Sequence, residues 1–79
     1  MVRIENINIT KNNVSFDYFP EDKNIKHFLK YDKSTKELLE HKKSDEYKSD
    51  VYAKHAYRAV ENVISKNQDI PKSFVVGWY

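Results

Sequence analysis

The hydrophobic residues between Ser49 and Lys66 recur at the spacing of an amphipathic α-helix. On a helix with 3.6 residues per turn, they fall along one stripe and the polar residues fall on the opposite side. The stripe consists of Ala53, Ala56, Val60, Val63 and Ile64, with Tyr52 and Tyr57 at its shoulders. Ser44 or Ser49 suits the N-cap, and Asp50 can pair with Lys54 one turn later. We therefore predict one helix over residues 49–66.

The segment before residue 20 alternates apolar and polar residues, as a β-hairpin does. The alternation shifts phase near Glu5 and Asn6, which predicts a bulge there. The turn falls in residues 11–13, because asparagine tolerates a positive φ angle. A loop of residues 12 and 13 sets Ile9 opposite Phe16. A loop of residues 11 and 12 changes the partners and keeps the same faces together.

Two further strands are predicted before the helix. Proline and acidic residues indicate a loop over residues 19–24, which precedes a strand over residues 25–31. The segment 37–42 contains Leu38 and Leu39, which also suit a short helix. We interpret it as a strand, because it directly follows a loop and would give Leu29 an apolar partner.

Residues 73–79 are β-branched and aromatic, which predicts a last strand. The element order is then β-β-β-β-α-β. This order predicts an α+β fold, in which an antiparallel sheet of four to five strands carries one amphipathic helix across one face. A length of 79 residues fits a single small globular domain over residues 1–79.

The absence of cysteine changes the expected location of the protein. Small secreted domains commonly depend on disulfides, so a chain without cysteine is expected to be cytoplasmic. No apolar run approaches the length of a membrane span, and residues 1–10 lack the apolar core of a signal peptide. We therefore expect a soluble protein with no membrane partner.

The charged residues are nearly balanced, with 14 Lys or Arg against 12 Asp or Glu. Residues 23–58 hold ten of the basic and six of the acidic residues, a local balance of +4. A dedicated nucleic-acid-binding protein has a denser basic surface. Weak nucleic-acid binding through this region is therefore our alternative function. The cations that would carry it are Lys42, Lys43, Lys48, Lys54 and Arg58.

The sequence lacks the motifs of known enzyme classes. Gly77 is the single glycine, which excludes a P-loop and a Rossmann turn. The serines lie in predicted turns and caps, and no pair of carboxylates stands out. We therefore predict that the protein is not an enzyme and uses no cofactor.

The three histidines are candidate metal ligands. With a three-residue loop in the second hairpin, His27 falls opposite His41, close enough for both to bind one ion. However, His55 lies on the polar side of the predicted helix, and one residue more or less in the loop breaks the pairing. We therefore predict no metal site.

One side of the helix is a candidate binding surface. If the helix begins near Asp45, this side gathers Tyr47, Val51, Lys54, His55 and Arg58. Exposed tyrosine and valine beside arginine are typical of protein interfaces. If the helix begins at Asp50 instead, the cations form an ordinary solvated face.

The last predicted strand is a second candidate surface. At a sheet edge it would be an open template for a partner's strand or for a homodimer. We favour an inner position, because a small core needs these apolar side chains, and we expect Tyr79, at the end, to be the most exposed of the group. The two surfaces together predict a small binding domain that acts through protein–protein interaction with an unidentified partner.

Overall fold

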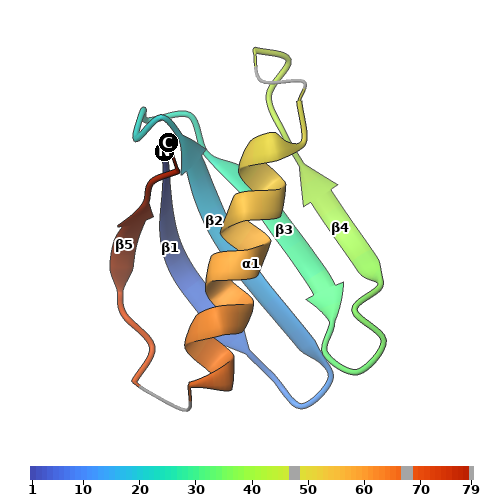
Figure 1. The fold of residues 1–79 in the computed structure, drawn as a ribbon. Helices are drawn as coiled ribbons and strands as arrows, with labels where there is room; N and C mark the ends of the chain where they lie inside the picture. The colour runs from blue at the N-terminus through green and yellow to red at the C-terminus, as the bar shows by residue number, and fades with distance from the viewer. Residues whose placement is uncertain (47–48, 67–68, 79) are drawn as a thin grey trace.

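A computed structural model describes residues 1–46, 49–66 and 69–78 (Figure 1). Five strands form one antiparallel sheet in the order β4-β3-β2-β1-β5, and one helix lies across a face of this sheet (Figure 1). The elements are β1 (Val2–Ile9), β2 (Asn13–Pro20), β3 (His27–Asp32), β4 (Leu38–Lys42), α1 (Val51–Ser65) and β5 (Ser73–Val76). The α+β fold predicted from the sequence is confirmed.

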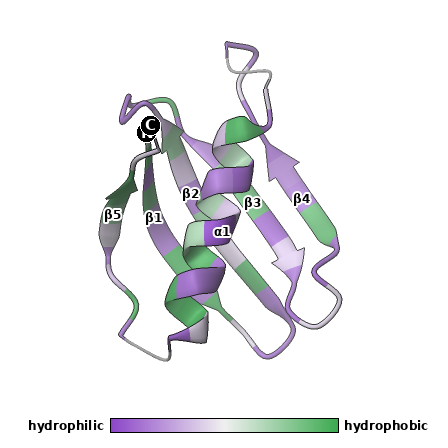
Figure 2. Cartoon of the chain, in the orientation of Figure 1, coloured by the Kyte–Doolittle hydropathy of each residue, from purple (hydrophilic) through white to green (hydrophobic). Residues whose placement is uncertain are grey.

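The hydrophobic core lies between α1 and the sheet. Alternate residues of β1, β2 and β3 point toward the helix, which gives the strands the banded hydropathy seen in Figure 2. The helix buries Ala53, Ala56 and Val60, as its apolar stripe predicts. Two alanines in this stripe let the helix backbone approach the sheet closely, over the large buried rings of Phe16 and Tyr18.

The first turn of α1 is attached to the end of β4. Asp50 is the N-cap residue, and its side chain makes no capping bond. Its carboxylate instead binds Lys43 Nζ at 2.8 Å, and this bond lowers the pKa of Asp50. Ser49 Oγ accepts a hydrogen bond from Val51 N–H at 3.3 Å. Asp50 therefore forms an ion pair with Lys43, and the charge of Lys54, its predicted partner, also lowers the pKa of Asp50.

The predicted bulge in β1 is present. The register of β1 with β2 shifts between Glu5 and Asn8, and within this shift Asn6 has a φ angle of 55°. Asparagine reaches this left-handed conformation more readily than other residues with a Cβ atom. Its Nδ2 also donates a hydrogen bond of 2.8 Å to Asp17 Oδ2, a buried carboxylate. Asn6 therefore has two roles: it adopts the left-handed conformation of the bulge, and it donates a hydrogen bond to the buried side chain of Asp17.

Two substitutions separate these roles of Asn6. Asn6→Gly loses the hydrogen bond to Asp17, and Asn6→Ala additionally holds a Cβ atom at positive φ. We expect the glycine variant to lower the free energy of unfolding by about 1–3 kcal/mol. The free energy of unfolding of the alanine variant should be lower than that of the glycine variant by about a further 1–2 kcal/mol. Urea denaturation measures both, and equal stability of the two variants would contradict the strained conformation of Asn6.

The turn of the first hairpin corrects one predicted register. Ile9 pairs with Val14, so its predicted pairing with Phe16 is wrong. Thr10 N–H donates to the Asn13 carbonyl at 2.9 Å, and the loop consists of residues 11 and 12. The second of our two predicted loops is therefore the correct one. Both loops place the same faces together, so the hydrophobic pattern alone did not distinguish them.

The strand at residues 38–42 is confirmed, but its predicted role is wrong. Leu29 pairs with His41 rather than with a leucine. Leu38 and Leu39 are about half exposed, at 53% and 49%. The physical reason is the position of α1, which packs chiefly on β1, β2 and β5. β4 lies at the opposite edge of the sheet, where the helix covers less of the surface.

Candidate functional site

β5 lies at an edge of the sheet and pairs there with β1. Our prediction that this strand is an inner one is wrong. β1 and β2 form a hairpin, and β3 occupies the free side of β2, so the outer side of β1 stays open and the chain that leaves α1 pairs there (Figure 1). Phe74, Val76 and Trp78 still pack against the core from this edge, where they are partly buried.

The backbone groups of Val75 point away from the sheet. The N–H of Glu21 donates to the carbonyl of Met1 at 2.8 Å, so the odd-numbered residues at this end of β1 face β2. The even-numbered residues therefore face β5, where they pair with Phe74 and Val76. Since backbone groups alternate along a strand, the N–H and C=O of Val75 are directed outward.

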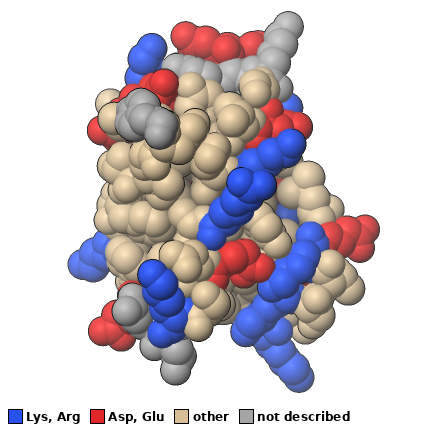
Figure 3. Space-filling model, viewed as in Figure 1, with Lys and Arg blue, Asp and Glu red and all other residues tan. Residues whose placement is uncertain are grey.

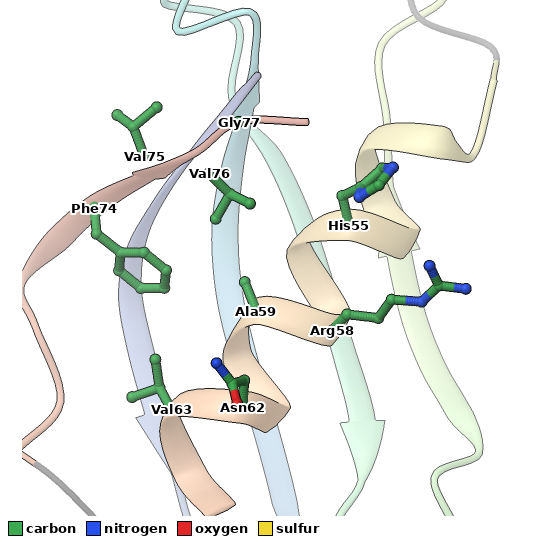
Figure 4. A pocket seen from close by; sticks show the side chains of 9 residues that line it. All are labelled: His55, Arg58, Ala59, Asn62, Val63, Phe74, Val75, Val76 and Gly77. Atoms are coloured by element: carbon green, nitrogen blue, oxygen red, sulfur yellow. The ribbon is translucent and has the colours of Figure 1, made fainter. Parts of the chain in front are cut away.

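An open groove of about 650 Å³ lies between α1 and β5 (Figure 4). Phe74 and Val76 of β5 face Ala59 and Val63 of the helix across it (Figure 4). The Val75 side chain points away from this groove and is 51% exposed. β5 therefore presents apolar side chains on both faces, together with outward backbone groups along its edge.

The ring of Trp78 closes one end of this region against the helix. It stacks on His55 with a centroid separation of 3.9 Å and an angle of 7°, and it meets Tyr52 edge-on at 5.6 Å. His55 is therefore half-buried and contributes to packing, whereas we had assigned it to the polar, ligand-binding side of the helix. The pairing of His55 with Trp78 was missed because periodicity within the helix carries no information on contacts after β5.

The opposite edge of the sheet carries features that oppose pairing with another chain. The register of β4 with β3 shifts between Lys30 and Tyr31, which interrupts a regular ladder. Glu40 and Lys42 of β4 form an ion pair at 3.1 Å. Bulges and charged side chains are common means of protecting an edge strand. In contrast, β5 pairs with β1 without a register shift and has no charged residue, so the edge at β5 lacks both of these protecting features.

The predicted surface on the helix is present in part. Val51, Lys54 and Arg58 are exposed and share one stripe of α1, since they are separated by three and four residues. The Arg58 side chain points away from β5 (Figure 4). Tyr47 and Tyr79 lie outside the described residues. Because α1 begins at Val51 rather than near Asp45, its start agrees with our alternative interpretation of a solvated face.

The cations proposed for nucleic-acid binding lie on different parts of the molecule. Lys54 and Arg58 are on the helix, where Figure 3 shows basic side chains beside an uncharged area over β5. Lys42 Nζ lies 5.9 Å from the ring centroid of Phe28, on the sheet face opposite α1. Lys43 is paired with Asp50, and Lys48 lies outside the described residues.

Two histidines flank the buried ring of Tyr18. His27 lies 4.8 Å from Tyr18 between ring centroids, and His41 Nε2 lies 2.5 Å from the Tyr18 hydroxyl oxygen. His41 pairs with Leu29 across the strands, so the register that would place His27 opposite His41 does not form. Within residues 1–46, 49–66 and 69–78, no three histidine or acidic side chains converge as metal ligands.

This histidine cluster belongs to the core. Burial lowers the pKa of His27 and of His41, and it raises the pKa of Tyr18. Tyr18 and His27 are only 2% and 1% exposed, so a substrate cannot reach them without opening the fold. The edge of β5 is therefore the stronger candidate for a functional site.

No protein-family model, no curated protein and no solved structure matches this chain. Across the described residues, no helix combines the length and the apolar character needed to cross a membrane. The candidate site therefore depends on the geometry of this chain alone.

Proposed function

We propose that this chain is a small non-enzymatic domain that binds other protein chains by adding a strand at the edge of β5. The observation that carries the proposal is the outward N–H and C=O of Val75 on an uncharged edge strand. An extended segment laid against this edge gains main-chain hydrogen bonds. Its alternate side chains would enter the groove beside Phe74 and Val63, so we expect the bound segment to be apolar at those positions.

Weak nucleic-acid binding ranks second among the proposed functions. The four of its cations that the structure describes are divided between the helix, the opposite sheet face and an ion pair, which disfavours a continuous phosphate-binding surface. The absence of enzymatic activity and the cytoplasmic location remain predictions from the sequence. A titration with mixed DNA and RNA oligonucleotides at low salt would detect the alternative function.

The main proposal is tested by capture of a partner from lysate of the native host with two matched variants. Val75→Pro removes the outward N–H, and Val75→Thr keeps it in a side chain of similar shape. Proline is tolerated in an edge strand where the N–H faces solvent, so both variants should fold. We expect wild type and Val75→Thr to capture the same protein, and Val75→Pro to capture about tenfold less. Equal capture by all three would refute strand addition at β5.

A further inference from the structure

We propose that β5 also binds the β5 strand of a second copy of this chain, antiparallel and about a two-fold axis that passes beside Val75. This inference rests on the proposed function, because it uses the same edge. It adds the identity of one partner and the register of the pairing. The homodimer is a symmetric assembly in which both copies use one surface.

The strand is complementary to itself in this register. With Val75 opposite Val75 of the second copy, Phe74 lies opposite Val76 and Ser73 opposite Gly77. The outward backbone groups of each strand then meet those of the other. The two Phe74–Val76 pairs lie on the groove face, and the two Val75 side chains meet on the opposite face. Residues 73–77 carry no charge, so no like charges are brought together.

In a neighbouring register, fewer backbone groups of the two strands can form hydrogen bonds. A shift of two residues toward the helix places Pro71 opposite Gly77 and Lys72 opposite Val76. Proline has no N–H to donate, and the lysine would lie against an apolar side chain. A shift in the other direction requires Trp78, whose ring is stacked on His55. The register centred on Val75 therefore uses the most backbone groups.

The contrast between the two sheet edges indicates a closed dimer. Each copy has one uncharged and regular edge, at β5, while β4 carries a register shift and an ion pair. Pairing of β5 with β4 would leave a free edge at each end and allow chains to grow, whereas pairing of β5 with β5 consumes both open edges. The two-fold arrangement also places both α1 helices on one face and joins their two apolar grooves.

The dimer is expected to be weak, because β5 has four residues. Interfaces smaller than the usual size form transient complexes, populated at high protein concentration. Sedimentation equilibrium over about a hundredfold range of concentration should therefore show wild type in exchange between monomer and dimer. Val75→Pro should weaken the dimer at least about tenfold, while Val75→Thr should retain it.

The register is tested by single cysteines, since the natural chain has none. In Val75→Cys, two Cα atoms in a hydrogen-bonded pair lie about 5.5 Å apart, within the range of a disulfide. In Ser73→Cys, the two cysteines are about 13 Å apart, which exceeds that range. We expect mild oxidation by glutathione disulfide to cross-link Val75→Cys much faster than Ser73→Cys.

The outcomes distinguish this inference from the proposed function. A wild-type chain that stays monomeric throughout, or a dimer that Val75→Pro leaves intact, would overturn the homodimer. Equal cross-linking of the two cysteine variants would overturn the register. If the chain is monomeric and Val75→Pro still loses the protein captured from lysate, only the homodimer fails and strand addition stands.

Discussion

Replacing Phe16 with alanine is expected to lower the free energy of unfolding by about 3–5 kcal/mol. Phe16 lies on β2, the central strand, and is 0% exposed beneath the helix. Its removal leaves a cavity between α1 and the sheet, in addition to the lost burial of a ring. A domain of this size has only about 5–15 kcal/mol of stability, so the variant should unfold at markedly lower urea concentration.

Phe28→Ala is the matched control for this prediction. Phe28 lies on the sheet face opposite α1, is half-buried, and is contacted by Lys42. The same chemical change should therefore cost less there, about 1–2 kcal/mol. Urea denaturation of both variants gives the comparison. An equal loss at the two positions would mean that the helix does not define the core.

The protein is expected to lose stability as the pH falls below about 6.5, the pKa of an unperturbed histidine. Burial lowers the pKa of His27 and of His41 in the folded state. As the pH falls, the histidines of the unfolded chain therefore bind protons before those of the folded chain. Their contribution to the stability is fully present above pH 6.5 and decreases below it. The slope for buried His27 reaches at most about 1.4 kcal/mol per pH unit.

The charged side chains around these histidines determine the pH range in which the histidines can be measured. Lys43 lies near both rings and opposes their protonation, whereas Asp50 favours the protonation of His41. The pKa of Asp50 is itself lowered below the ordinary value of 3.8, so urea denaturation between pH 7 and pH 5 isolates the histidines from this carboxylate. His27→Gln should reduce the slope in this range. An unchanged slope would show that His27 is not the group responsible.

Local patterns in the sequence predicted the fold correctly. The apolar stripe from Ala53 to Ile64 predicted the helix and the face that it buries, because a period of 3.6 residues places the apolar residues of this segment on one side. The phase change near Asn6 predicted the bulge in β1. The loop of the first hairpin remained open between two choices, since both preserve the buried face.

Relations between distant segments were not predictable from these patterns. An apolar strand has the same composition at an edge as at the centre of a sheet, so the position of β5 depends on which side of β1 the other strands leave open. The exposure of Leu38 likewise follows from where α1 lies, and periodicity does not encode that position. The ion pair of Lys43 with Asp50 and the stack of His55 on Trp78 arise from the same long-range arrangement.

The candidate site combines both kinds of information. The sequence identified residues 73–79 as an apolar segment with no charged side chain, and it named strand pairing as the consequence of an edge position. The structure supplied the edge, the outward direction of Val75 and the groove beside Phe74. The helix surface around Arg58, which the sequence ranked above the last strand, has no comparable backbone feature.

Amide hydrogen exchange along β5 in a dilute sample tests most directly that this strand is paired on one side only. The amides of Phe74 and Val76 should be protected by their bonds to β1, and those of Ser73 and Val75 should exchange rapidly with solvent. This alternation is the predicted result. Protection of all four amides at low concentration, as in an inner strand, would contradict the account.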